Sequence, residues 1–288
     1  MIYAISDIHG DKKQAIKLLQ KHGVIDNDNK WIAGSSTLVV NGDSTDRGSD
    51  GIATLRLFFN LSKEAEAVGG RVIHTMGNHD ALILCMALHS LNKDYNYEHA
   101  YVFSGIGGKQ HEAVSLSRLH DLRRYIQSFP LMCRVDDVLF QHADGFELYN
   151  RVTKNADTPE EKIKLANQYC RVEAQSAWGA WNLFYDITDE RWWQNSGELM
   201  PEYLESFGAK MVVHGHTGFY GDSPHFYLDN MVVNIDAILS RGYRSDEDRG
   251  CVLVIDSPGT DIIMYFSSIV AARPYYRSEE HTSELQSR

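Results

Sequence analysis

Short apolar runs alternate with amphipathic stretches over the first 91 residues of the chain. Three brief runs rich in β-branched or aliphatic side chains are predicted strands: residues 1–6, 36–40 and 71–76. Three stretches with apolar residues at helical spacing are predicted helices: residues 11–22, 49–68 and 81–91. Strand, polar loop and helix therefore repeat three times, which predicts βαβ units with parallel strands.

Two of the predicted helices carry recognisable start signals. Asp11 followed by Gln14 resembles a capping box, and Gly23 suits the C-terminal cap of the same helix. Thr158 is expected to cap a later helix, with Pro159 at its first helical position.

The middle of the chain is less regular. Residues 92–130 are expected to form a cap-like insertion that helps to choose the substrate, with a loop at 105–108 and one helix around 112–128. A second insertion is expected around 145–205. Its aromatic stretch is predicted to pack as a cap rather than to stack nucleic-acid bases, because apolar surface of this size is normally buried.

The second half of the chain is predicted to be β-rich. Residues 131–134 and 138–141 flank Asp136 and Asp137, which is the pattern of a hairpin. Five further strands are predicted at 210–213, 225–228, 232–235, 251–255 and 262–266.

Composition narrows the class of protein. The chain has 288 residues, of which 43% are hydrophobic and 23% charged, so we expect a globular protein with one elaborated domain over residues 1–276. The net charge of −11 argues against nucleic acid and anionic membranes as partners. The four cysteines form no CxxC pair, and we see neither a signal peptide nor an apolar run of roughly 20 residues, so a cytoplasmic location is expected.

The last twelve residues, 277–288, have no apolar period. They resemble an in-frame translation of a sequencing-library adapter, and we expect them to be a non-native tail. On that interpretation the natural carboxyl terminus lies beyond about Tyr276 and is missing.

The loop after the second predicted strand concentrates charge. Asp43 and Asp46 stand three residues apart, and Arg47 follows immediately. Charges brought together at a strand end cost stability unless something compensates them, and the carboxyl ends of strands in an open α/β sheet are where ligands bind. We therefore expect a bound cation in this loop.

Five polar blocks stand in order at predicted loop positions. They are Asp7 with His9; Asp43, Asp46 and Arg47; Asn78 with His79; His142; and His214 with His216. The blocks resemble the pattern DxH, GDxxDR, GNH(D/E), H and GH of the calcineurin-like metallophosphoesterase superfamily. The closest resemblance is to its phosphoprotein phosphatase branch, represented by small bacterial and phage enzymes. One block is a weak signal, but five in order are highly specific.

The resemblance implies an α/β fold, a four-layer sandwich of two mixed sheets flanked by helices. It also implies two divalent metal ions, one held by Asp7, His9 and Asp43 and the other by Asp43, Asn78, His142 and His216. Asp43 would bridge the ions together with a hydroxide that attacks phosphorus in line. His79 would protonate the leaving oxygen, Asp46 would orient His79, and Arg47 would bind the phosphate oxygens. A ligand set without thiolate suits Mn, Fe or Zn, of which Mn is the first choice.

Simpler interpretations exist for single members of the set. Asp7 could cap the first helix and Asn78 the third. His142 alone would more often be a structural histidine than a ligand. We expect His214 to point away from the site and His74 to lie in the core or behind the ligands.

The chain departs from the resemblance at two places. A second phosphate-binding arginine is usual in the family, yet the region from Trp178 to Asn182 contains none, and Arg171 or Arg241 would have to substitute. Glycine commonly follows the histidine of the fourth block, whereas this chain has Ala143.

We therefore expect an enzyme that hydrolyses phosphomonoesters, a Ser/Thr-type protein phosphatase acting on phosphorylated protein or small phosphoesters. A symmetrical dinucleoside tetraphosphatase is the alternative, and Asp46 favours the phosphatase because the tetraphosphatases often lack an acid there. A non-catalytic binding module is disfavoured, because every ligand position is filled.

Overall fold

The computed structural model describes residues 1–143, 146–188, 197–240 and 249–256. It is an α/β structure with two mixed sheets flanked by helices, which confirms the predicted fold class. The predicted strand at 262–266 and the predicted adapter-like tail at 277–288 lie outside the described residues. None of the helices in the described ranges combines the length and the hydropathy that a membrane crossing needs.

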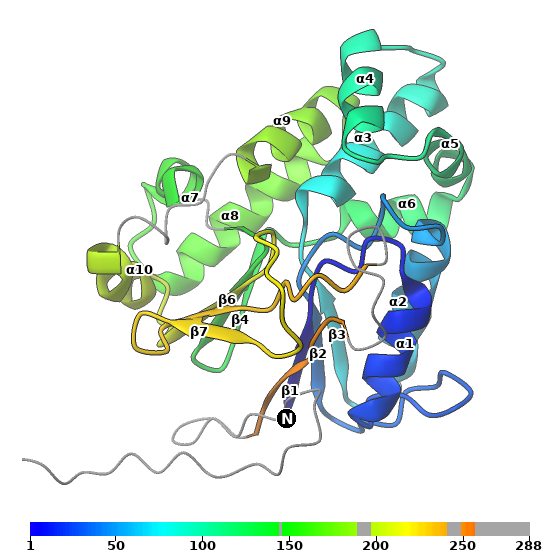
Figure 1. Cartoon of the computed structure of the whole chain (residues 1–288). Helices are drawn as coiled ribbons and strands as arrows, with labels where there is room; N and C mark the ends of the chain where they lie inside the picture. Colours follow the sequence, from blue (N-terminus) through cyan, green and yellow to red (C-terminus); the bar gives the residue numbers. More distant parts are fainter. Residues whose placement is uncertain (144–145, 189–196, 241–248, 257–288) are drawn as a thin grey trace, which may run out of the picture.

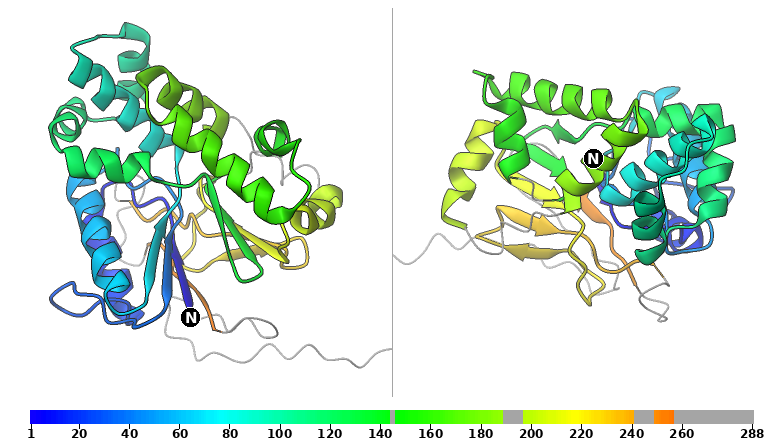
Figure 2. Two further views of the ribbon diagram at one scale, coloured as in Figure 1. Left: turned by 180° about the vertical axis from the view of Figure 1, so that it is seen from behind. Right: turned by 90° about the horizontal axis from the view of Figure 1, so that it is seen from above.

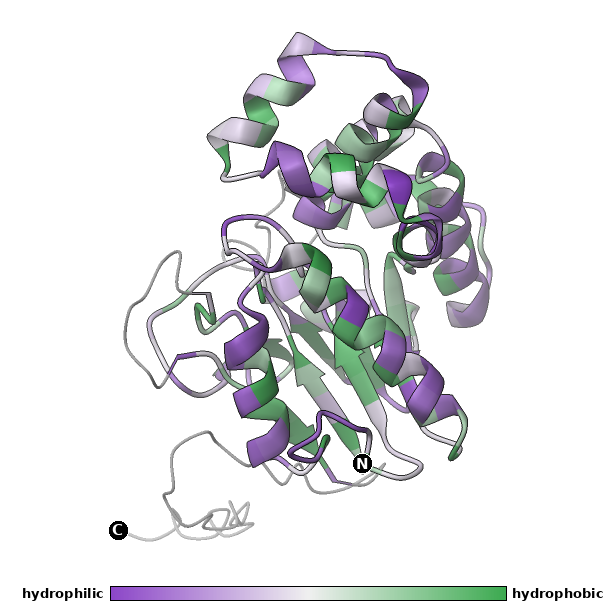
Figure 3. Ribbon diagram, turned by 90° about the vertical axis from the view of Figure 1, so that its right-hand side faces the viewer, coloured by the Kyte–Doolittle hydropathy of each residue, from purple (hydrophilic) through white to green (hydrophobic). Residues whose placement is uncertain are grey.

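The first sheet has the order β3-β2-β1-β9. Its strands β1 (Ile2–Ile5), β2 (Thr37–Val40) and β3 (Arg71–His74) run parallel, and β9 (Leu253–Ile255) pairs antiparallel with β1. Helices α1 (Lys12–Lys21) and α2 (Gly51–Glu66) connect the parallel strands in the predicted alternation. Figure 3 shows that the strands are hydrophobic while these helices carry hydrophilic residues on part of their surface.

The second sheet has the order β4-β5-β6-β8-β7. Strands β4 (Met132–Val135) and β5 (Val138–Gln141) form the predicted hairpin. Parallel pairing then joins β5 to β6 (Met211–His214) and β6 to β8 (Val232–Asn234), and β7 (His225–Tyr227) closes the edge antiparallel.

The alternation of side chains along β1 explains how the layers are held together. Ile2 and Ala4 join the core between the two sheets, where they meet Phe140 of β5. Tyr3 and Ile5 point the other way, into the core beneath α1 and α2. Both faces of the strand are therefore buried, which is why the sequence shows a continuous apolar run there.

Most of the remaining helices lie at the end of the molecule opposite the N-terminus, whereas the last of them lies beside the second sheet (Figures 1 and 2). They are α3 (Asn78–Asn92), α4 (Tyr97–Gly105), α5 (Gln110–Arg118), α6 (His120–Gln127), α7 (Phe146–Thr153), α8 (Pro159–Glu173), α9 (Ala177–Thr188) and α10 (Met200–Ser206), the last preceded by a 3-10 turn, Gly197–Leu199. We refer to helices α3 to α9 as the helical cap. Helix α3 is buried on all sides from its first residue to His89 and packs against α5 and α9.

Two sequence predictions in the cap were wrong. The single helix expected around 112–128 is two helices, because Leu119 leaves the helical conformation (φ −92°, ψ 81°) between α5 and α6. Helix α4 was missed, although Asn96 caps it by accepting a hydrogen bond from the backbone N–H of His99. Thr158 caps α8 as predicted, by accepting from the N–H of Glu161.

Candidate active site

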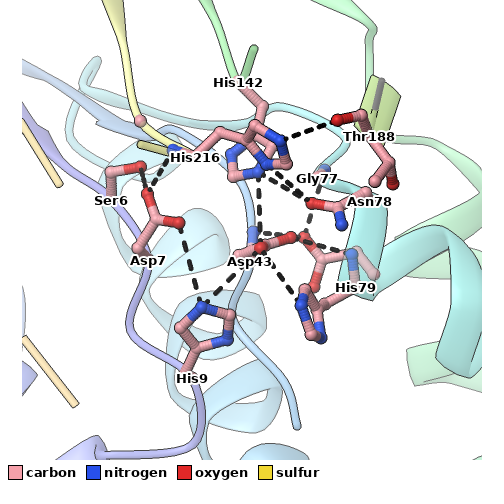
Figure 4. Close-up of polar contacts among 12 residues, drawn as sticks. Ser6, Asp7, His9, Asp43, Gly77, Asn78, His79, His142, Thr188 and His216 are labelled. Carbon is pink, nitrogen blue, oxygen red and sulfur yellow. Dashed lines mark hydrogen bonds and ion pairs between the residues drawn. The ribbon is translucent and has the colours of Figure 1, made fainter. Parts of the chain in front are cut away.

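Five strands, three from the first sheet and two from the second, end in loops that converge between the two sheets and the helical cap. Asp7 and His9 follow β1; Asp43, Asp46 and Arg47 follow β2; Asn78 and His79 open α3 after β3; His142 follows β5; and His216 follows β6. Figure 4 shows the labelled members of this set facing one another. We call these nine residues the loop cluster. The structure therefore brings together all nine of the residues singled out from the sequence.

The loops reach this geometry through unusual backbone conformations. Asp7, His9, Asp43 and His216 all have positive φ, between 45° and 64°, although none is glycine. The first two loops are fastened to each other, because His9 donates its N–H to the carbonyl of Asp43 at 2.9 Å. Left-handed backbone in non-glycine residues costs of order 1–3 kcal/mol each and is concentrated at functional sites.

Asp43 is the centre of the loop cluster. Its Oδ2 lies 3.3 Å from His142 Nε2, 3.7 Å from His9 Nε2 and 4.0 Å from His79 Nε2. Its Oδ1 accepts the backbone N–H of His79 at 2.9 Å. Two groups of potential metal ligands share this carboxylate: one with His9 and His79, the other with His142 and His216.

The histidine rings are held so that one nitrogen of each faces the interior of the site. His9 Nδ1 lies 3.1 Å from the carbonyl of Thr45, and His142 Nδ1 lies 2.8 Å from the carbonyl of Asn41. These contacts leave Nε2 of both rings facing the interior of the site. His216 uses the opposite arrangement, because its Nε2 contacts the carbonyl of Thr188 at 3.2 Å. Such outer contacts are typical of histidines that bind metal.

The amide oxygen of Asn78 completes the second group. It lies 3.2 Å from His142 Nε2 and 3.1 Å from His216 Nδ1. Asn78 is the first residue of α3, but the N-cap position belongs to Gly77. The side chain of Asn78 is therefore directed to the site rather than to capping. Asp7 likewise does not cap α1, since Asp11 does.

Burial and crowding set the charge of the site. Burial alone would lower the pKa of His142, but the carboxylates of Asp43 and Asp7 outweigh burial and raise it to about 10. Burial opposes ionisation of Asp43, yet His142 and His79 hold its pKa well below the usual range. Burial raises the pKa of Asp7. Carboxylates this close together need positive charge beside them, and oxygen and nitrogen donors of this kind fit divalent metal ions.

His79 and Asp46 form a buried pair. The distance from His79 Nδ1 to Asp46 Oδ2 is 3.1 Å. Arg47 lies beside them, with Nη1 2.9 Å from His9 Nε2 and Nε donating to the carbonyl of Ile106 at 3.3 Å. The guanidinium thus lies against the ring of His9, and its position depends on residues that follow α4.

A cavity of about 370 Å³ opens onto the loop cluster. Seven of the nine predicted residues line it, whereas Asp46 and His142 lie deeper. Its apolar wall comes from Ile106, Phe184 and Ile238, the first two of which belong to the two insertions predicted from the sequence. Arg47 is the one arginine among the described residues that line the cavity. Arg171 lies on α8, and Arg241 falls outside the described residues.

Two acidic residues of the site were missed in the sequence. Asp80 accepts hydrogen bonds from the backbone N–H groups of Asp43 at 2.8 Å and Ser44 at 3.1 Å, so it shapes the loop that follows β2. Its signal was the last letter of the GNH(D/E) block. Asp236 lines the cavity. Burial, and to a smaller extent repulsion from Asp7, raises the pKa of Asp236 well above the usual range. Its signal was its place directly after a predicted strand.

The two histidines set aside in the sequence lie where they were expected. His214 bonds through Nε2 to the hydroxyl of Tyr227, away from the loop cluster. His74 stacks on Phe129 and contacts the hydroxyl of Ser44 at 2.8 Å through Nε2, behind the ligands.

Comparisons with known proteins agree with this geometry. Residues 1–220 match the family model of the calcineurin-like phosphoesterases. The chain is 28% identical to Shewanella-like protein phosphatase 1 of Plasmodium berghei over 79% of its own length and 66% of that protein. It is 35% identical to Shewanella-like protein phosphatase 2 of Arabidopsis thaliana, over 28% of its own length and 21% of that protein. The chain therefore spans less than two thirds of either relative.

Solved structures show the same fold. A cold-active protein tyrosine phosphatase superposes with a TM-score of 0.65 at 23% identity, covering 88% of this chain and 72% of that one. A structure of such an enzyme from a psychrophilic Shewanella gives 0.63 at 22% identity, with 88% and 74% covered. The family carries out its chemistry with divalent metal ions. From the match over residues 1–220 and the converging ligands, the chain belongs to the calcineurin-like phosphoesterase family.

Proposed function

We propose that this chain hydrolyses phosphomonoesters on proteins, using two divalent metal ions, with Mn²⁺ as the first choice. The observation that carries the proposal is the position of Asp43, whose carboxylate is shared by two groups of potential ligands, one of which includes His79, the partner of Asp46. Relatives and structural neighbours that are named as protein phosphatases support the substrate class.

For the metal ions we keep the ligand assignment that the sequence resemblance implies. Asp7, His9 and Asp43 would hold one ion, and Asp43, Asn78, His142 and His216 the other. When bound, the ions supply a nucleophile at neutral pH and positive charge for the phosphoryl oxygens.

The protein's own groups would do the rest. The carboxylate of Asp46 accepts the Nδ1–H of His79 and so keeps Nε2 of that ring towards the cavity, where it can donate a proton to the leaving oxygen. Arg47 supplies a guanidinium at the edge of the cavity for the phosphate oxygens. The apolar side chains of Ile106 and Phe184 would contact the part of the substrate that carries the phosphate.

The proposal is tested with metal-stripped protein assayed with and without added Mn²⁺. The substrates are p-nitrophenyl phosphate, peptides carrying phosphoserine, phosphothreonine or phosphotyrosine, and diadenosine tetraphosphate. We expect metal-dependent release of phosphate from the aryl ester and from the peptides. His111, an exposed histidine on α5, provides the control variant His111→Asn, which should keep full activity. Cleavage of the dinucleotide alone would overturn the proposal.

A further inference from the structure

A second cluster of potential metal ligands lies in the helical cap, away from the loop cluster. Cys85 and His89 stand four residues apart on α3, so they share one face of the helix. His99 on α4 completes the group, and the donor atoms of the three side chains lie within 4.8 Å of one another. All three residues are buried. We call them the cap cluster.

The distances in the cap cluster are close to those around a bound zinc ion. His99 Nδ1 lies 2.9 Å from His89 Nε2 and 3.4 Å from Cys85 Sγ. Ideal tetrahedral zinc would place two nitrogens about 3.3 Å apart and a nitrogen and a sulfur about 3.6 Å apart. For the two pairs that include His99, shifts of a few tenths of an ångström would therefore bring the donor atoms to the spacing of zinc ligands.

Hydrogen bonding alone does not satisfy this arrangement. The Nδ1 atom of His99 can hold one hydrogen or offer one lone pair, but it is approached by both His89 Nε2 and Cys85 Sγ. The other ring nitrogen of His99, Nε2, is buried and has no hydrogen-bond partner among the described residues. A cation at the centre would use the donor atoms of all three side chains at once.

The surroundings of the cluster also suit a metal ion. His89 Nδ1 lies 3.0 Å from a carboxylate oxygen of Asp94, the contact that commonly orients a metal-bound histidine. His99 stacks on Trp181 of α9 with ring centroids 3.8 Å apart, which fixes the plane of its ring.

We propose that Cys85, His89 and His99 supply three of the four ligands of a second metal site, which binds Zn²⁺ and ties α4 to α3. A thiolate together with two imidazoles favours zinc over the harder ions that suit oxygen ligands. The Cys85 thiol would give up its proton as the sulfur–metal bond forms, so one proton is released for each ion bound. This site is independent of the function proposed for the loop cluster.

The position of α4 explains what such an ion would achieve. The chain that leaves α4 accepts two hydrogen bonds from Arg47, at the carbonyls of Ile106 and Gly107. An ion that links His99 of α4 to α3 would therefore also hold in place the segment after α4 that contacts Arg47.

Cobalt provides a probe that reports on the cap cluster alone. Co²⁺ bound by a thiolate gives a sulfur-to-metal charge-transfer band, and the loop cluster contains no cysteine. Intact protein, stripped of metal and titrated with Co²⁺, should develop this band. At saturation the intensity of the band should correspond to one thiolate-bound Co²⁺ ion per chain. Added Zn²⁺ should displace it.

Variants locate the site. Cys85→Ala should abolish the band and lower the zinc content by one equivalent, whereas Cys133→Ala, which removes a buried cysteine from β4, should leave both unchanged. Asp43→Asn, in the loop cluster, should also keep the band. Far-ultraviolet circular dichroism would confirm that each variant is folded.

Asp94→Asn gives a second test that does not endanger folding, because the Asp94 side chain is 62% exposed. Loss of this contact should weaken Co²⁺ binding about 10- to 100-fold. A folded wild-type protein without the charge-transfer band would overturn the proposal, as would a band that survives in Cys85→Ala.

Discussion

Helix α3 carries parts of two ligand clusters that are built in different ways. The loop cluster assembles oxygen and nitrogen donors from five strand ends, and several of its residues adopt strained backbone conformations. The cap cluster takes two of its three donors from adjacent turns of one regular helix and includes a thiol. A reactive centre needs donors aimed from many directions, whereas a structural ion needs only neighbours on packed helices. The four experiments below test this contrast, from the largest expected effect to the smallest.

Asp43→Asn should have the largest effect, because it removes the carboxylate that both groups of the loop cluster share. We expect kcat/KM for p-nitrophenyl phosphate to fall at least about 10³-fold, since the metal ions supply several kcal/mol of transition-state stabilisation. The cobalt–thiolate band of the cap cluster should remain. Activity close to that of the parent would remove Asp43 from the centre of the reaction.

His79→Asn should lower kcat about 10²- to 10⁴-fold, because in the proposed reaction the ring of His79 donates a proton to the leaving group. The metal content of the loop cluster should stay the same, because in that proposal His79 does not bind a metal ion. Steady-state kinetics together with metal analysis would measure both quantities. His111→Asn is the matched control. Equal loss of metal and activity would show that His79 is a ligand instead.

Two glycines compare the backbones of the two regions. Gly42, at the end of β2, has φ +85°, and a Cβ there would lie 2.3 Å from His142 Nδ1. Gly42→Ala should therefore lower the free energy of unfolding by about 1–3 kcal/mol and weaken metal binding. Gly105, at the end of α4, has open space around its Cβ direction, so Gly105→Ala should change stability by less than about 1 kcal/mol. Urea denaturation would measure both, and equal losses would contradict the contrast.

The affinity of the loop cluster for metal should rise with pH. Without metal, Asp43 and Asp7 hold the pKa of His142 near 10, against the effect of burial, so at neutral pH a metal ion must displace a proton from this ring. The apparent affinity should therefore increase up to about tenfold per pH unit between pH 7 and 9. Competition with a chelator at several pH values would measure it. An affinity independent of pH would show that His142 is not a ligand.

Much of the fold and of the loop cluster could be predicted because their signals are local. The apolar runs that became β1, β2 and β3 needed no knowledge of distant residues, and each was followed by a polar block. Thr158 and Pro159 marked the start of α8 for the same reason. Parallel strands bring their carboxyl ends to one edge of a sheet, so the order of the first three blocks along the chain already implied that they meet.

Other features depended on contacts between residues far apart in the sequence. The break at Leu119 and the presence of α4 are decided by how the cap helices pack on α3, which a helical period does not reveal. Asp80 received no role from the sequence, and only the structure showed that it binds the backbone of the loop after β2. The sequence contained no sign of the cap cluster, because its only cysteine, Cys85, has no second cysteine close to it along the chain.

The sequence by itself determined the strands, the connecting helices and the nine residues of the loop cluster, because hydrophobic period and motif order are properties of the chain alone. Only the tertiary structure decided which nitrogen of each histidine faces the site and which insertion residues wall the cavity. It also brought His99 to Cys85 and His89. Those outcomes depend on packing between distant segments, where burial and the competition for hydrogen bonds select one arrangement among many.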